Sequence, residues 1–364
     1  MSGPVLTLNA GSSSIKLALL DEQGDPLARR DAPAGADWIE EITALLDEAP
    51  EPWAAGHRVV HGGERFTEPT VIDDRVESEI EGLCELAPLH NPPVLAGIRA
   101  LRQVRPNLPA VACFDTAFHH ALPAAAAAYA LPQSWSRRWE LRRFGFHGLS
   151  HAYCAGRASA LVEQPLEELR IVTAHLGAGA SLAAVSGGHS VDTTMGFTPM
   201  DGLVMATRPG SLDPGLLLWV IQHGGVDPAE AERALEHEAG LLGISGSSGD
   251  IRELLALAED GDAPATLALD VYVHRLASSV AAMAAAMEGI DVLAFTGGVG
   301  ENSAEIRSCS CERLRFLGMA LDEAANNRAT DDADLATKAS PVRIVRVGAR
   351  EDRLIAEQVR ATLS

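Results

Sequence analysis

The segment Val5–Leu20 reads VLTLNAGSSSIKLALL and places two apolar runs on either side of a small polar turn. The runs Val5–Asn9 and Ile15–Leu20 have the length and composition of strands, so the segment predicts a β-hairpin. A tight hairpin turn needs two or three residues, whereas this turn is longer and is followed by Lys16. Amide, hydroxyl, backbone N–H and ammonium groups together suit phosphate oxygens. The segment lacks the GxxxxGK[ST] pattern of a Walker A loop, and a surface hairpin with a capping serine run explains it equally well.

A second strand–turn–strand pattern, VTAHLGAGASLAAVSGGHS, opens the other half of the chain. Gly11 aligns with Gly177 and Ala18 with Ala184, at an offset of 166 residues. This match predicts an internal duplication, although short Gly-rich hairpins also resemble one another by chance. Two similar domains that face each other would form a cleft able to hold a phosphate chain from both sides.

The composition limits the class of protein. The chain has 364 residues, which fits two domains, and 47% of them are hydrophobic. The formal net charge of −21 argues against a duplex nucleic-acid surface and against an anionic membrane surface. An anionic ligand must therefore be met by local positive groups, so single Arg and Lys residues near Gly-rich loops are informative.

The cysteines predict reduced thiols in a cytoplasmic protein. Their number is odd, no CxxC pair occurs, and the two nearest ones are too close for a typical zinc half-site. We expect no secretory leader and no membrane span, because the Ala-rich segments are too short or are broken by proline. The five residues are Cys84, Cys113, Cys154, Cys309 and Cys311.

The rest of the chain alternates predicted helices and strands, which indicates an α/β architecture with ligands at Gly-rich strand ends. Helices are expected at 38–46, 80–86, 94–104, 214–223, 228–239, 251–258, 267–289, from 304 onward, and at 352–363. Strands are expected within 57–63 and at 110–114, 291–295 and 342–347, a Gly/Ser loop at 241–249, and a domain boundary in the Pro- and Ala-rich passage 122–135.

Four polar residues could serve either chemistry or structure, and for any single Arg a pair with a structural carboxylate is the commoner case. Arg58 and Arg208 are surrounded by small or apolar residues, where a guanidinium can bind a carboxylate or a phosphate through a planar fork. Asp115 follows a predicted strand and could orient an Arg, bind a metal or cap the next helix. His147 lies between Phe146 and a glycine, where a structural histidine is the ordinary interpretation.

Taken together, ten ordered segments resemble the acetate kinase family, from Asn9 to about Arg307. They are LNAGSSSIKL, HRVVHGG, APLHNPP, FDTAFH, FGFHGLSH, HLGAGAS, MGFTPMDGL, TRPGSLDPG, LLGISGSSGDIREL and FTGGVGENS. The resemblance implies an α/β fold of two duplicated domains of the acetate and sugar kinase/Hsp70/actin (ribonuclease H-like) type with an interdomain cleft. It also implies a first domain of residues 1–117 plus 354–364, and a second domain of residues 118–353.

The resemblance implies a role for each matching position. The catalytic set is Arg58, Asp115, His147 and Arg208, and the substrate pocket is Arg58, Val60, Leu89, Phe146 and Pro199. The ATP contacts are Ser12, Ser14, Lys16, His175, Leu176, Gly177, Ala178, Gly179, Asp250, Ile251, Arg252, Gly298, Val299, Gly300, Glu301 and Asn302. Asn9 and Glu351 would hold Mg²⁺ or Mn²⁺, and the protein would be a homodimer.

The implied reaction is reversible, Mg²⁺-dependent transfer of the ATP γ-phosphoryl group to acetate, which gives acetyl phosphate and ADP. The alternatives are a propionate or butyrate kinase of the same superfamily, or a non-catalytic nucleotide-binding relative. Three features depart from the family pattern. Ala178 replaces the usual Asn of HLGNG, the segment GARED replaces a PTNEE-like segment, and the region before HRVVHGG is shorter.

Overall fold

The structure is a computed structural model that describes residues 3–11, 14–88 and 90–364. The chain forms two compact units. Unit 1 consists of Met1–His120, Phe146–Leu149 and Arg350–Ser364, and unit 2 consists of Ala121–Gly145 and Ser150–Ala349. These ranges differ from the expected domains at 118–120, 146–149 and 350–353, which belong to unit 1. The last helix, α15, packs on the sheet of unit 1 over its whole length, and this draws 350–353 into that unit.

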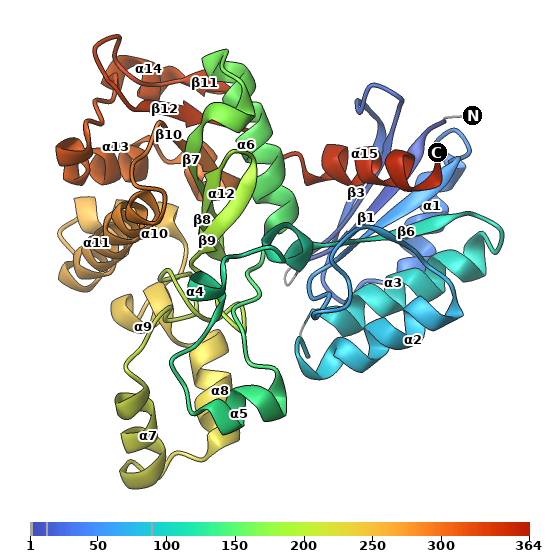
Figure 1. Cartoon of the computed structure of the whole chain (residues 1–364), viewed down its shortest axis with the longest axis horizontal. Coiled ribbons are helices and arrows are strands. Elements are labelled where there is room, and N and C mark those ends of the chain that lie inside the picture. The colour runs from blue at the N-terminus through green and yellow to red at the C-terminus, as the bar shows by residue number, and fades with distance from the viewer. Residues whose placement is uncertain (1–2, 12–13, 89) are drawn as a thin grey trace. The chain divides into compact units, whose positions relative to one another are not determined.

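The elements are coloured along the chain in Figure 1. Unit 1 contains β1 (Val5–Ala10), β2 (Ser14–Leu20), β3 (Pro26–Pro33), α1 (Trp38–Asp47), β4 (Ala54–Val59), β5 (Thr70–Val71), α2 (Asp74–Gly82), α3 (Asn91–Val104), β6 (Ala110–Phe114) and α15 (Glu351–Leu363), with 3₁₀ turns at Leu83–Glu85 and Asp115–His119. Unit 2 contains α4 (Ala124–Ala127), α5 (Gln133–Trp139), most of α6 (Gly148–Val162), β7 (Arg170–Leu176), β8 (Ala180–Ser186), β9 (His189–Thr193), α7 (Pro214–His223), α8 (Pro228–His237), α9 (Gly240–Ser245), α10 (Ile251–Glu259), α11 (Ala263–Ala286), β10 (Val292–Thr296), α12 (Gly297–Asn302), α13 (Ala304–Arg313), α14 (Glu323–Arg328), β11 (Ala333–Asp334) and β12 (Arg343–Arg346), with 3₁₀ turns at Leu166–Glu168 and Arg315–Leu317.

The two units contain sheets of the same topology. In the described residues the first sheet has the order β3-β2-β1-β4-β6-β5, and the second has the order β9-β8-β7-β10-β12-β11. In each, a three-stranded antiparallel meander continues into parallel strands and ends on a short antiparallel edge strand. The predicted duplication and the α/β fold class are therefore confirmed.

The register of the duplication differs by one residue from the sequence alignment. The Thr7 hydroxyl donates to the carbonyl of Ala18 across the first hairpin at 3.2 Å. The Thr173 hydroxyl makes the same bond to Ala183 across the second hairpin at 3.4 Å. Ala18 thus corresponds to Ala183, and its alignment with Ala184 was wrong, because the second hairpin has one residue fewer between its paired strand ends.

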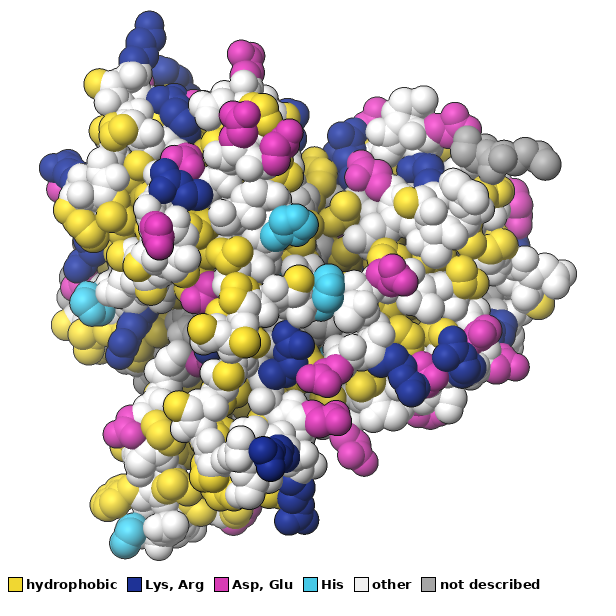
Figure 2. Space-filling model, viewed as in Figure 1, with side chains coloured by type: hydrophobic (Ala, Val, Ile, Leu, Met, Phe, Trp, Pro, Cys, Tyr) yellow, Lys and Arg dark blue, Asp and Glu magenta, His cyan; other side chains and the backbone are white. Residues whose placement is uncertain are grey.

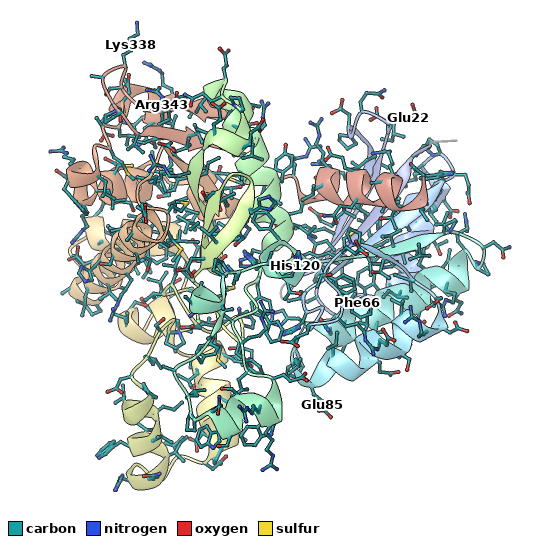
Figure 3. The ribbon with its side chains drawn as sticks, in the orientation of Figure 1. Glu22, Phe66, Glu85, His120, Lys338 and Arg343 are labelled. Atoms are coloured by element: carbon teal, nitrogen blue, oxygen red, sulfur yellow. The ribbon has the colours of Figure 1, made fainter. Side chains whose placement is uncertain are left out.

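The core of unit 1 follows the alternation of its strands. Leu6 and Leu8 are buried with α1 and α3 on one face of the sheet, whereas Val5 is buried against Ile355 of α15 on the other. Figure 1 shows α15 on one side of these strands and α2 and α3 on the opposite side. Near the end of β4, the ring of Phe66 stacks on that of Phe114 at 4.6 Å and closes the α3 side (Figure 3). The carboxyl ends of β1, β4 and β6 remain at one edge.

Several local expectations differ from the structure. The expected Gly/Ser loop contains α9, and β3, α5, α6, α12 and α14 have no counterpart among the expected elements. The helix expected at 80–86 is the end of α2, which begins at Asp74, followed by the 3₁₀ turn Leu83–Glu85. Short, Gly-rich segments carry little helical signal of their own, so contacts elsewhere in unit 2 decide their conformation. All five cysteines are free, as expected.

The outer face of α2 and α3 carries paired charges. Arg99 and Arg102 form ion pairs with Glu77, at 2.7 and 2.9 Å, and blue and magenta side chains interleave over these helices in Figure 2. Exposed pairs of this kind contribute little to stability. In the described part of the chain, no helix combines the length and the apolarity that a membrane span needs.

Candidate active site

Four polar side chains of unit 1 meet where its parallel strands end. Asn9 is the penultimate residue of β1, Arg58 is the penultimate residue of β4, and Asp115 directly follows β6. The Arg58 guanidinium donates to Asp115 from Nη2 at 2.6 Å and from Nε at 3.1 Å, and to Asn9 Oδ1 from Nη1 at 3.0 Å. Asn9 Nδ2 in turn donates to Glu351 at 3.0 Å. Carboxyl ends of adjacent parallel strands are where open α/β sheets bind ligands.

The Arg58 side chain is 12% exposed and that of Asp115 is fully buried. Burial lowers the pKa of the guanidinium, but the charges of Asp115 and Glu351 and the hydrogen bonds to Asp115 raise it by more, so Arg58 stays charged. Of its five N–H groups, three donate to Asp115 and Asn9. Among the described residues, the other two meet no acceptor and are available to an anion.

Asp115 is held from two sides. Burial raises its pKa, whereas Arg58 and the backbone N–H of Leu149 lower it. That N–H belongs to the first turn of α6, which begins at Gly148 immediately after His147. His147 has a φ of 55°, a left-handed conformation that is uncommon for a residue other than glycine. Glu140, Glu163 and Glu288 share this conformation, so the φ of His147 marks the sharp turn that starts α6.

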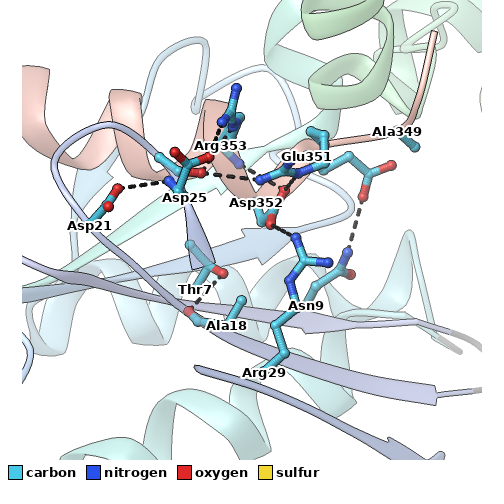
Figure 4. Close-up of polar contacts among 12 residues, drawn as sticks. Thr7, Asn9, Ala18, Asp21, Asp25, Arg29, Ala349, Glu351, Asp352 and Arg353 are labelled. Carbon is cyan, nitrogen blue, oxygen red and sulfur yellow. Dashed lines mark hydrogen bonds and ion pairs between the residues drawn. The ribbon is translucent and has the colours of Figure 1, made fainter. Parts of the chain in front are cut away.

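Two arginines at the start of α15 bind the turn between β2 and β3. Arg350 Nη2 and Arg353 Nε both donate to the carbonyl of Gly24, at 3.1 and 3.0 Å, and Arg353 also pairs with Asp25. Figure 4 shows these contacts beside the bond from Asn9 to Glu351. These bonds hold the start of α15 in place. They explain how the GARED segment brings Glu351, the first residue of the helix, to Asn9 at the end of β1, 342 residues away in sequence.

The remaining predicted residues of unit 1 lie around this cluster. Lys16 of β2 is exposed and stands opposite Asn9 in the strand register, so both side chains lie on the same face of the sheet. Ser14 opens β2. Val60 and Phe146 are buried, at 4% and 1% exposure. The predicted residues Ser12 and Leu89 lie outside the described residues.

In unit 2, His175 is the penultimate residue of β7, which is followed by the Gly-rich turn 177–179. Its Nδ1 lies 2.8 Å from the hydroxyl of Ser150. Gly177 closes the turn by donating to the Gly179 carbonyl at 3.0 Å. The Ala178 side chain is exposed and its carbonyl accepts from the backbone of Ala206. Leu176 is buried as the last residue of β7.

The second Gly-rich segment of unit 2, Gly298–Asn302, forms most of α12 after β10. The buried guanidinium of Arg307 donates to the carbonyls of Gly300 and Glu301, at 2.9 and 2.8 Å, and Arg346 donates to Glu301 at 2.8 Å. Burial lowers the pKa of Arg307 to about 10, with Arg346 adding to the effect. Val299 lies inside this short helix. Sequence reasoning missed both arginines, because neither stands within a Gly-rich motif.

Two further predicted pairs lie in unit 2. Asp250 is the N-cap of α10, and its side chain accepts a hydrogen bond from the backbone N–H of Arg252. The same carboxylate forms an ion pair with the exposed guanidinium of Arg252 at 2.6 Å. Ile251, which lies between the two in sequence, is buried. These bonds lower the pKa of Asp250 to about 2. Arg208 Nη1 donates weakly to the Pro199 carbonyl at 3.4 Å. Burial lowers the pKa of Arg208, and among the described residues no carboxylate forms an ion pair with it.

The donor chemistry of Asn9 and Glu351 fits Mg²⁺. Both offer hard oxygen atoms, and Mg²⁺ usually takes only one or two protein carboxylates, keeps several waters and uses substrate phosphates. Among the described residues no group of three or more His, Cys, Asp or Glu side chains could hold a metal by itself.

Most of the chain is similar to known proteins of one family. The model of the Acetokinase family matches residues 33–357. An acetate kinase of Synechococcus sp. is 50% identical over 314 residues, which cover 86% of this chain and 77% of that protein. The crystal structure of Porphyromonas gingivalis acetate kinase superposes with a TM-score of 0.92 at 35% identity and full coverage of both chains. A propionate kinase from Francisella tularensis superposes with a TM-score of 0.90 at 35% identity, covering 98% of this chain and 99% of that one.

Proposed function

Because this chain belongs to the Acetokinase family, we propose that it transfers the γ-phosphoryl group of ATP reversibly to acetate, giving acetyl phosphate and ADP. It is thus a phosphotransferase with a carboxyl group as acceptor. The observation that supports this most is the cluster of Arg58, Asp115, Asn9 and Glu351 at the ends of three parallel strands. It combines a preorganised cation with oxygen donors for a metal.

The reaction requires the protein mainly to supply positive charge and to position the two reactants. Acetate is already an oxyanion, so no strong base is needed to make the nucleophile. Catalysis then consists of bringing two anions into line and stabilising the charge on the transferring group. The two remaining N–H groups of Arg58 would bind the carboxylate or the phosphoryl group, and Asp115 would hold that guanidinium in place.

The other roles follow the same requirement. His147 and Arg208 would stabilise the phosphoryl oxygens in the transition state. Asn9 and Glu351 would hold Mg²⁺, which neutralises phosphate charge when bound. The nucleotide would contact Ser12, Ser14, Lys16, the turn 175–179, the start of α10 and α12. Val60, Leu89, Phe146 and Pro199 would enclose the methyl group.

An assay that traps acetyl phosphate as its hydroxamate tests the function directly. With ATP, Mg²⁺ and acetate, the purified protein should form hydroxamate, and propionate should react less well. Faster turnover of propionate would show a propionate kinase. Nucleotide binding without product from any short-chain acid would show a non-catalytic relative and would refute the proposal.

Ala178→Asn should lower the KM for ATP and leave the KM for acetate nearly unchanged. The Ala178 side chain is exposed, so an amide has room to reach a phosphate, while the bond from the Gly177 N–H to the Gly179 carbonyl keeps the turn closed. Steady-state kinetics with ATP varied at saturating acetate measure this. A rise in the KM for ATP would mean that the turn does not approach the phosphates.

We further propose a cytoplasmic homodimer. The support for a dimer is α7, which contains no buried residue and exposes Leu216, Leu218 and Trp219. Exposed apolar groups of this size on one helix are typical of an interface. Light scattering should give twice the mass of one chain, and Trp219→Glu should shift the distribution toward monomer. The free cysteines support a reducing compartment.

A further inference from the structure

The backbone of His61, in the loop after β4, is held by one side chain from α3. Asn91 Oδ1 accepts from the His61 N–H at 3.2 Å, and Asn91 Nδ2 donates to the His61 carbonyl at 3.1 Å. Both residues are completely buried. A planar amide that satisfies both backbone groups of one residue imitates a strand partner, and in a dry interior neither bond can be replaced by water.

Neighbouring bonds fix the rest of this loop. The Gly62 N–H donates to the Thr116 hydroxyl at 3.0 Å, and the Gly63 N–H donates to His61 Nδ1 at 2.9 Å. The Phe66 N–H donates to the Gly62 carbonyl at 3.1 Å. Burial lowers the pKa of His61 to about 4, so its ring is neutral at physiological pH and Nδ1 can accept. Backbone groups of residues 61, 62, 63 and 66 are thus all hydrogen-bonded, and Asn91 holds the first part of the loop.

His61 touches both described walls of the proposed acyl pocket. Val60 directly precedes it in the chain, so any movement of the His61 backbone moves Val60. The ring of Phe146 meets the His61 ring edge to face, with centroids 5.4 Å apart. Val60 and Phe146 are themselves almost fully buried, so a shift of the His61 backbone or ring must be taken up by these side chains and their packing.

We propose that Asn91 is a specificity-determining positioning residue, which through His61 holds Val60 and Phe146 at the spacing that admits acetate and disfavours longer acids. This inference rests on the proposed function and extends it. One methylene in an apolar pocket changes discrimination by about 10- to 200-fold, so a small shift of either wall is measurable. Asn91 is not among the residues assigned to either reactant, and both of its side-chain hydrogen bonds that the structure describes go to the His61 backbone.

The test is the ratio of kcat/KM for propionate to kcat/KM for acetate. This ratio compares two substrates on the same folded enzyme, so a variant that folds only in part still reports it correctly. Asn91→Asp keeps the size and the acceptor but places an oxygen against the His61 carbonyl, and Asn91→Ala removes both bonds. Each should raise the ratio at least about fivefold, with less than a twofold change in the KM for ATP.

Two further variants calibrate the measurement. Val60→Ala enlarges the pocket directly and should raise the same ratio. Asn326→Asp alters another buried asparagine, which in unit 2 accepts from Arg307 and donates to the Ala304 carbonyl, and should leave the ratio unchanged.

The outcomes separate the inference from the proposed function. If Val60→Ala raises the ratio and both Asn91 variants stay within twofold of the wild type, the role of Asn91 is refuted while the acetate kinase activity stands. An equal rise in Asn326→Asp also refutes it, because any buried amide would then have the same effect. Absence of acetate turnover in the wild type refutes the proposed function and this inference with it.

Discussion

Arg58→Ala should lower kcat for acetyl phosphate formation by at least about 100-fold, the scale of removing one preorganised charge-stabilising donor. Arg58 is the cation at the centre of the unit 1 cluster, and its two remaining N–H groups are the ones available to an anion there. Steady-state kinetics measure the effect. Arg99→Ala is the matched control, because that half-exposed guanidinium of α3 pairs only with Glu77 and Glu81 of α2 among the described residues and should change kcat by less than twofold.

Loss of Arg58 also leaves the buried Asp115 carboxylate without its cation. Breaking a buried pair on one side costs about 3–5 kcal/mol, so Arg58→Ala should unfold at a lower temperature as well. The double variant Arg58→Ala/Asp115→Ala removes the uncompensated charge and should regain part of that stability without regaining kcat. Recovery of activity in the double variant would contradict a direct role for Arg58.

Arg208→Ala should show the same loss of kcat with little loss of stability. Its one weak bond goes to the Pro199 carbonyl, and no described carboxylate is left unpaired when it is removed. Thermal unfolding and kinetics on the same sample separate the two effects. Near-normal turnover would exclude Arg208 from phosphoryl transfer.

Gly148→Ala should destabilise the protein by at least about 2 kcal/mol and lower its activity. A Cβ at this position would lie 1.9 Å from the Asp115 carbonyl oxygen and 2.8 Å from Phe118 Cβ. The first of these atoms is backbone and cannot move aside, so the start of α6 must shift. That shift removes the Leu149 N–H from Asp115 and displaces His147.

Gly156→Ala is the matched control in the same helix. A Cβ at Gly156 meets nothing within 4 Å, so this substitution should be neutral or stabilise the helix by up to about 1 kcal/mol. Denaturant unfolding of both variants gives the comparison. Equal stability of the two would mean that α6 does not pack against Asp115 as described.

Local sequence determined much of the fold. The alternation of Leu6 and Leu8 with Val5 defines two buried faces of β1, and the polar turn after Asn9 ends the strand. Similar patterns in the second half revealed the duplication, and apolar periodicity located α3, α11 and α15, though not α6. These features depend on residues close together in the chain, which is why a sequence displays them.

Three features were decided only by tertiary structure. Glu351 reaches Asn9 because Arg350 and Arg353, at the start of α15, bind the β2–β3 turn more than 300 residues away. Nothing in the GARED segment itself indicates this contact. The segment after β10 is helical because Arg307 and Arg346 satisfy the carbonyls at its end, whereas its glycines alone favour a turn. Asn91 is an ordinary polar residue in sequence. It binds both backbone groups of His61 only because α3 buries it against that residue. In each case the deciding interaction joins residues distant in sequence, and its strength comes from burial, which no local pattern encodes.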